Sequence, residues 1–210
     1  MMIRTLSTLE QHCVNIIFEA YRSTGWEYSA FFDSSNGALI ELLTEQNASG
    51  ADPSQRLVRM ARSGTEFIVH HNHPSQGSLS LSDWNGAATL NFREIFAHCE
   101  DGTVYWGTAA NSAKLQYFFY SNPIDQRGER ILVDLLCKNE CFDDISAVAI
   151  FGREIANRAM KIVGYVDYEV SWGSTQSPSA NSSAPTSVSH WAKKYESLID
   201  EAAKLLAREI

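Results

Sequence analysis

The feature that most constrains this chain is a pair of histidines at the end of a short apolar run. Residues 67–69, Phe-Ile-Val, are typical of a buried strand, and His71 and His73 follow within four residues. Side chains two apart on a strand point to the same side, so both imidazoles can reach one ion. Pro74 comes next and ends the strand, because proline cannot donate to a sheet ladder.

A carboxylate completes the set of candidate metal ligands. A Ser- and Gly-rich loop leads from Pro74 to Asp83, where a helix is expected to begin, and folding of this loop returns Asp83 to the two imidazoles. Two nitrogens and one carboxylate leave room for a water, as catalytic zinc sites do and closed structural sites do not. Such a zinc ion lowers the pKa of its water toward about 7 and polarises a carbonyl. The same ligands also suit iron(II), so the metal stays open between the two.

The order His-x-His-Pro and then Ser-x-x-Asp resembles the metal-binding signature of the JAMM (JAB/MPN) metalloprotease family. The opening His-Asn-His-Pro-Ser is most similar to bacterial and phage members and to the RadC-like branch. The resemblance implies His71, His73 and Asp83 as zinc ligands and Ser80 as the serine that positions the scissile carbonyl. The loop between His73 and Ser80 is one residue shorter than the commonest spacing in the family, which keeps Ser82 as a rival for the serine role.

The family also uses a glutamate from an earlier strand as general acid/base. Trp26–Phe32 predicts a strand, and Glu27 lies 44 residues before His71, a separation comparable with that of the family. The role needs a carboxylate that takes a proton from the attacking water and returns it to the leaving amine. The resemblance therefore indicates Glu27 as the catalytic glutamate, with Glu41 and Glu45 as its rivals.

The elements around this stretch predict an α/β (α+β) fold, with a JAMM/MPN-like mixed sheet flanked by helices and a C-terminal helical appendage. Asn36 and Gly37 are a strong hairpin signal. The predicted helix after Asp83 is expected to pack on the sheet through Leu90, Phe92 and Phe96. The expected helices are Thr5–Tyr21, Ser54–Arg62, Trp84–Phe96, Asp125–Cys137 and Ile145–Val163, and the expected strands are Trp26–Phe32, Ala38–Thr44, Phe67–Val69, Thr103–Trp106 and Gly164–Trp172.

The chain is expected to divide into a domain, a linker and a helix. Residues 1–172 would form the JAMM/MPN-like domain, in which 110–172 either complete the core or form an added platform that grips a substrate protein. Residues 173–189 are uncharged and Ser-rich, which is typical of a flexible linker. Residues 190–210 predict an amphipathic helix that could pair with itself, dock on the domain or bind a protein partner.

Charge and composition limit the partners and the compartment. The net charge is −8 and no basic run exceeds two residues, which opposes a large phosphate-binding face and hence a nucleic-acid partner. No apolar segment approaches the roughly 18 residues of a membrane span, and the N-terminus lacks the apolar core of a signal peptide. The four scattered cysteines are expected to be reduced thiols, so the expected location is cytoplasmic.

Three classes of function follow. The leading hypothesis, implied by the resemblance, is a zinc-dependent hydrolase that cleaves amide or isopeptide bonds at the C-terminus of a ubiquitin-like protein. The alternatives are a non-catalytic binding module of the same fold and a RadC-like protein linked to DNA, which the acidic charge opposes. Fold alone does not choose among these classes.

Overall fold

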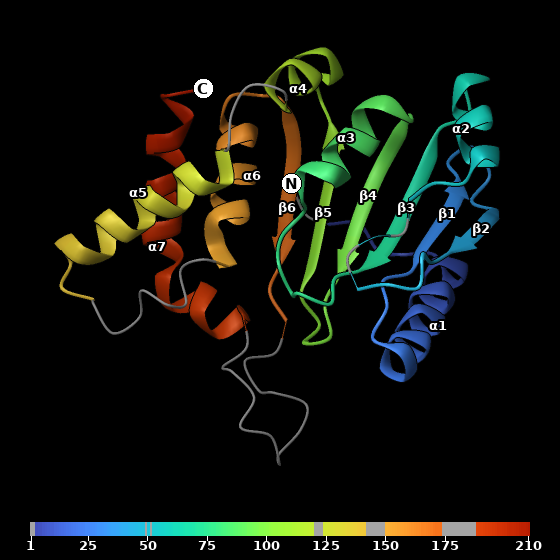
Figure 1. Ribbon diagram of the computed structural model, residues 1–210, viewed down its shortest axis with the longest axis horizontal. Coiled ribbons are helices and arrows are strands. Elements are labelled where there is room, and N and C mark those ends of the chain that lie inside the picture. The colour runs from blue at the N-terminus through green and yellow to red at the C-terminus, as the bar shows by residue number, and fades with distance from the viewer. Residues whose placement is uncertain (1–2, 49, 51, 120–123, 142–149, 174–187) are drawn as a thin grey trace.

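The computed structural model describes residues 3–48, 50, 52–119, 124–141, 150–173 and 188–210 (Figure 1). The strands are β1 (Ser29–Asp33), β2 (Leu39–Leu43), β3 (Phe67–Asn72), β4 (Phe92–His98), β5 (Val104–Ala109) and β6 (Val166–Ser171). The helices are α1 (Thr8–Thr24), α2 (Gln55–Arg62), α3 (Leu81–Thr89), α4 (Ser112–Phe119), α5 (Ile124–Lys138), α6 (Gly152–Ile162) and α7 (Val188–Ala207). The predicted class, a mixed sheet flanked by helices with a C-terminal helix, is confirmed.

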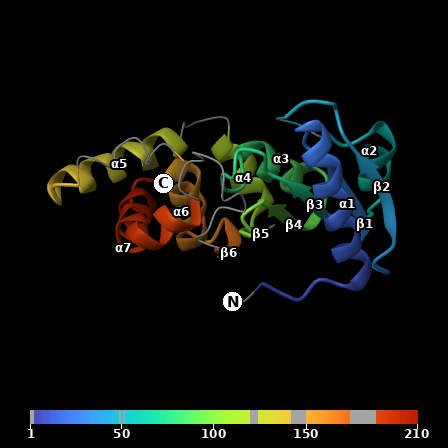
Figure 2. The same ribbon diagram turned by 90° about the horizontal axis from the view of Figure 1, so that it is seen from below.

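The described strands form one sheet in the order β2-β1-β3-β4-β5-β6. Strand β3 pairs parallel with β4 and antiparallel with β1, and the other pairs are antiparallel. Helix α1 packs on β1 and β3 from one face (Figure 2), whereas α3 and α6 pack on β4, β5 and β6. Strand β3 therefore lies near the middle of the sheet, where the strands that α1 covers meet those that α3 and α6 cover.

Helix α1 begins where its capping residues dictate. Ser7 is the N-cap, and Ser7 and Glu10 bond reciprocally to each other's backbone N–H in a capping box. Gly25 ends the helix in the left-handed conformation at φ +72°, which glycine adopts without the steric cost of a side chain. The predicted helix Thr5–Tyr21 is present, and it is shifted by three residues because these two caps set its ends.

The predicted hairpin is present between β1 and β2. Asp33 N–H donates to Ala38 O across the turn, and Gly37 has φ +71°. The predicted strand Trp26–Phe32 begins only at Ser29, because the backbone N–H groups of residues 26–28 donate to loop and side-chain acceptors and not to the backbone of a neighbouring strand. Glu27 therefore lies just ahead of β1 and not within it.

The predicted helix Trp84–Phe96 is wrong in its second half. Helix α3 ends at Thr89, Asn91 turns the chain at φ +56°, and Phe92 opens β4. The apolar residues of β4 fit helical spacing and a doubly covered parallel strand equally well, because buried parallel strands lack polar alternation. Phe92 and Phe96 consequently belong to the sheet and do not form the inner face of a helix.

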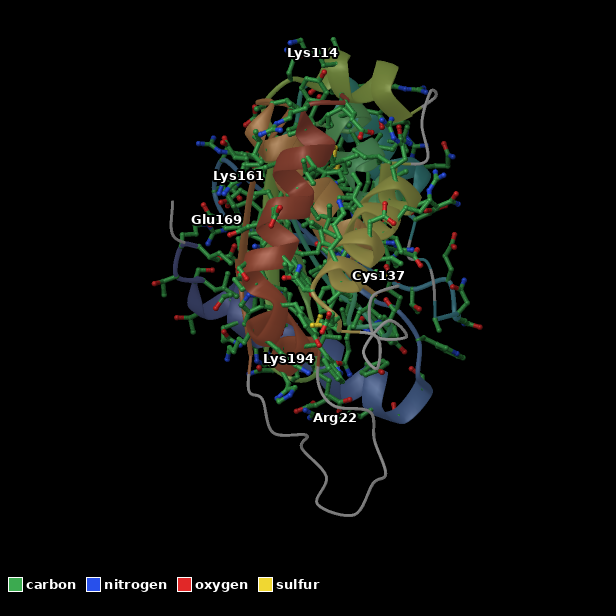
Figure 3. All side chains as sticks on the ribbon, turned by 90° about the vertical axis from the view of Figure 1, so that its left-hand side faces the viewer. Arg22, Lys114, Cys137, Lys161, Glu169 and Lys194 are labelled. Carbon is green, nitrogen blue, oxygen red and sulfur yellow. The ribbon has the colours of Figure 1, made fainter. Side chains whose placement is uncertain are left out.

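The C-terminal helices form a layer beyond β6. Helix α6 packs on β6, and α5 and α7 pack on α6 and on each other; Figure 3 shows α7 crossing in front of α6. Buried Leu132, Ile155 and Ile199 share one hydrophobic cluster with Val69 and Trp84 of the sheet and α3. This continuity favours the interpretation in which the region after residue 110 completes the core.

Two predictions for the C-terminal part concern residues that lie partly outside those the structure describes. The predicted linker lies almost wholly at 174–187 and the start of the predicted helix Ile145–Val163 at 145–149, both outside the described residues. The predicted final helix 190–210 is observed as α7, and it docks on α5 and α6 through buried Ala192, Ile199 and Ala202. Among the described helices, none combines the length and the apolar character that a membrane crossing needs.

Candidate metal centre

The structure brings the three predicted ligands together. His71 lies near the end of β3 and His73 one residue beyond it, with their Nε2 atoms 2.8 Å apart. Asp83 Oδ1 is 3.3 Å from His71 Nε2, and Asp83 Oδ2 is 3.6 Å from His73 Nε2. Potential ligand atoms of all three lie within 4.8 Å of one another, which makes a possible metal-binding triad; no second such group occurs among the described residues.

Asp83 reaches this place because it sits in the first turn of α3. Ser80 is the N-cap, and its N–H and Oγ–H donate to Asp83 Oδ2 at 2.6 and 2.7 Å. Asp83 N–H donates in return to Ser80 Oγ at 3.2 Å. The Ser-x-x-Asp spacing is therefore a capping box, which holds the carboxylate against the imidazoles. Ser82, the rival serine, is exposed and also lines the cavity beside the triad.

The second ring nitrogens of both histidines meet backbone groups. His73 Nδ1 lies 2.6 Å from Gly77 O, so it carries the proton and donates it. The His71 ring has a hydrogen bond with the backbone of Phe96. Each Nε2 is then left with its lone pair toward the other ring, a contact that requires a proton or a cation between them. Metal-binding histidines are commonly oriented in this way, so the residues present fit a divalent cation.

The protonation preferences agree with this geometry. Burial lowers the pKa of His71 to about 4, which keeps its ring neutral near pH 7. Burial alone would raise the pKa of Asp83, but attraction to the His71 and His73 rings when they are protonated, together with hydrogen bonds from His73 and Ser80, outweighs burial and holds that pKa well below its usual range. Burial likewise opposes protonation of His73, but its contact with Asp83, the charge of Asp83 and the hydrogen bond to Gly77 together outweigh burial and raise the pKa of His73. One neutral imidazole and one carboxylate are thus ready as ligands, and a metal would displace a single shared proton.

A cavity of about 550 Å³ opens beside the triad and includes Glu27. Burial in this cavity, partly offset by attraction to His73, raises the pKa of Glu27 to about 7. The rivals Glu41 and Glu45 do not line the cavity, and Glu41 instead accepts a hydrogen bond from Ser54 at 2.8 Å. Of the three predicted glutamates, the geometry favours Glu27.

Asn72 is a residue whose role the sequence did not reveal. Its Oδ1 accepts from Tyr28 N–H at 2.8 Å, and its Nδ2 donates to Trp26 O at 3.2 Å. Asn72 lies between His71 and His73, and by strand alternation it points to the other side of β3. It therefore fastens the segment that carries Glu27 to the strand that carries the ligands. Its place between the two histidines is the one signal in the sequence that could have singled it out.

Comparisons with known proteins leave this site to be interpreted on its own geometry. No family model matches the chain, and neither the curated proteins nor the solved structures contain a match.

Proposed function

We propose that this protein is a zinc-dependent hydrolase of the JAMM type, which cleaves an amide or isopeptide bond after the C-terminus of a ubiquitin-like protein. The observation that carries the proposal is that Glu27 shares one cavity with His71, His73 and Asp83. A proton acceptor and three ligands with space between them are the parts that metal-assisted amide hydrolysis needs. The ubiquitin-like substrate rests on the resemblance of the motif.

Zinc held by His71, His73 and Asp83 would polarise the carbonyl and acidify a water. Glu27 can accept a proton from the attacking water at a carboxylate oxygen and return it to the leaving amine. In the metal-free protein its pKa is about 7. In the structure the Ser80 hydroxyl and the Ser80 N–H both donate to Asp83. If the hydroxyl turned toward a substrate oxygen, as its proposed role requires, the Ser80 N–H would be the one hydrogen bond from Ser80 that still holds Asp83.

The proposal is tested with Glu27→Gln, which keeps the side-chain size and removes the base. Turnover of a ubiquitin-like fusion or a peptide amide should fall by roughly 10²–10⁴, the usual contribution of a positioned general base. Zinc content, measured by elemental analysis, should stay at that of the parent, because Glu27 is not a ligand. Glu41→Gln is the matched control, since Glu41 lies on neighbouring β2 outside the cavity, and it should cut at the parental rate.

Two outcomes would replace the proposal. Equal cutting by Glu27→Gln and the parent would remove Glu27 from the mechanism. A parent that cuts no ubiquitin-like substrate but binds one would support the non-catalytic binding module. Elemental analysis of the same samples also distinguishes zinc from iron(II), the other metal that these ligands suit.

A further inference from the structure

The loop that joins His73 to α3 is held by a residue from the C-terminal helical layer. Asn157 of α6 is buried, with an exposed fraction of 1%. Its Nδ2 donates to Ser78 Oγ at 2.8 Å and to Leu79 O at 2.9 Å. Its Oδ1 accepts from Trp84 Nε1 at 2.7 Å. One amide thus joins α6 to the loop and to α3, across more than 70 residues of sequence.

The chemistry of the partners fixes the orientation of this amide. The Trp84 indole can only donate and the Leu79 carbonyl can only accept, so the Asn157 oxygen and nitrogen cannot be exchanged. Every polar atom of the side chain is paired in a buried place, where hydrogen bonds are strong and an unpaired group is costly. The contact therefore allows one placement of the loop.

The bonded residues lie directly beside the metal centre. Leu79 and Ser78 follow Gly77, whose carbonyl accepts from His73 Nδ1. Trp84 follows Asp83 in the first turn of α3. Asn157 has no hydrogen bond to His73 or Asp83 itself. It holds Ser78 and Leu79 just before the Ser80–Asp83 capping box and Trp84 just after it.

The hydrogen bonds continue from Ser78 into the rest of the layer. Tyr168 of β6 donates its one hydroxyl proton to Glu154, so Ser78 donates to the Tyr168 oxygen at 2.7 Å. Glu154 accepts from Arg158 at 2.7 Å, and Arg158 also pairs with α7. Burial raises the pKa of the Tyr168 hydroxyl well above its usual value, so it stays protonated as a donor. From Asn157 through Ser78 and Tyr168 to Glu154 each donor points the same way, which strengthens the neighbouring hydrogen bonds.

We propose that Asn157 is a positioning residue for the metal centre, acting through Ser78, Leu79 and Trp84 on His73 and Asp83. The inference rests on the proposed function, because it requires a metal at the triad. Loss of the outer hydrogen bonds that orient metal ligands typically weakens metal binding by 10–100-fold. The C-terminal helical layer then contributes to the metal centre, because its residue Asn157 helps to hold His73 and Asp83 in position.

The test compares Asn157→Leu with Ile155→Ala in the full chain. Asn157→Leu keeps the side-chain size and removes all three hydrogen bonds. Ile155→Ala removes buried apolar volume from the same helix and leaves those bonds in place. Zinc affinity, measured by competition with a chromophoric chelator on folded protein, should fall about 10–100-fold in Asn157→Leu and stay parental in Ile155→Ala. Hydrogen exchange in zinc-free protein should rise at residues 77–84 relative to β3 in Asn157→Leu alone.

A second variant keeps the test decisive if Asn157→Leu does not fold. Trp84→Phe removes the Nε1 donor together with part of the buried indole ring, a loss of apolar volume for which Ile155→Ala is the control. It should shift zinc affinity and exchange in the same direction by a smaller factor. Parental zinc affinity in folded Asn157→Leu or Trp84→Phe, beside a parent that binds zinc, would overturn the inference and leave the proposed function standing. A parent that binds no zinc would overturn the proposed function and the positioning role together.

Discussion

The histidines on the two faces of β3 lie in different surroundings, one face beside the candidate metal centre and the other under α1. His71 and His73 face a cavity beside Asp83, with both Nε2 atoms turned toward each other. His70 faces the other way, as strand alternation predicts, and its ring bonds to His98 at 2.9 Å and to Glu10 at 3.2 Å under α1. The same residue type is thus a candidate ligand on one face and a closed structural contact on the other. The layer that covers each face makes the difference.

The two glutamates nearest these clusters show the same contrast. Glu10 and Glu27 are both removed from bulk water, which by itself raises the pKa of each. For Glu10, hydrogen bonds from His70, Arg4 and Ser7 outweigh burial and hold the pKa well below its usual range. Glu27 has no such set of donors, so burial prevails and its pKa rises to about 7. A carboxylate is left ready to exchange protons only where the fold provides few donors.

The sharpest way to break the comparison is to remove a histidine from each face. His71→Ala and Asp83→Ala should each weaken zinc binding by more than about 100-fold, beyond the effect of losing an outer contact. His70→Ala should keep the parental zinc content, because its ring lies on the opposite face. Elemental analysis after gel filtration measures all three variants. Full zinc content in His71→Ala would place the metal elsewhere.

Mutations on the His70 face of β3, which α1 covers, should lower the stability of the fold and leave zinc binding unchanged. Glu10→Ala leaves the buried His70 ring without its carboxylate partner, removes a pair to Arg4 and breaks the capping box of α1. The expected loss in free energy of unfolding is about 3 kcal/mol, as for a buried group left unpaired together with a lost cap. Urea denaturation measures it, with exposed Glu19→Ala on the same helix as the control. A change of a few tenths of a kcal/mol would show that the cluster contributes little.

The smallest expected effect is on the pH dependence of stability, and it concerns Glu27 in the cavity beside the triad. In metal-free protein the pKa of Glu27 is about 7, above an unfolded value near 4.3, so the folded state prefers the protonated acid. The resulting stability is present below about pH 4.3 and is lost as the pH rises through 7. Glu27→Gln should therefore match the parent at pH 4 and exceed it at pH 8. With a discount for partial exposure the gain is about 1 kcal/mol, or 2–4 °C in Tm.

Thermal melts of metal-free protein between pH 4 and 8 measure this difference, with exposed Glu19→Gln as the control. A difference between Glu27→Gln and the parent that stays constant over this range would mean that Glu27 keeps its ordinary pKa in the folded protein.

Elements with local signals were predicted well, and elements that depend on distant partners were not. The hairpin at Asn36-Gly37 is fixed by turn chemistry that a few neighbouring residues supply. Helix α1 was predicted apart from a shift of three residues, which the caps at Ser7 and Gly25 set. Strand β4 was expected as a helix, because its apolar residues suit both elements and the choice depends on pairing with β3. The same reason explains Asn157, which reaches Ser78 from 79 residues away and carries no motif.

The sequence by itself determined which residues can be ligands. The i, i+2 spacing of His71 and His73 puts both rings on one side of a strand, and Ser80 three residues before Asp83 builds a capping box from local bonds alone. Only the tertiary structure decided that Glu27 and not Glu41 shares their cavity, and that Asn72 and Asn157 fasten the segments around them. Spacing along a strand or helix is set by backbone geometry, which the local sequence specifies. The meeting of distant segments depends on the packing of the whole core, which no single stretch specifies.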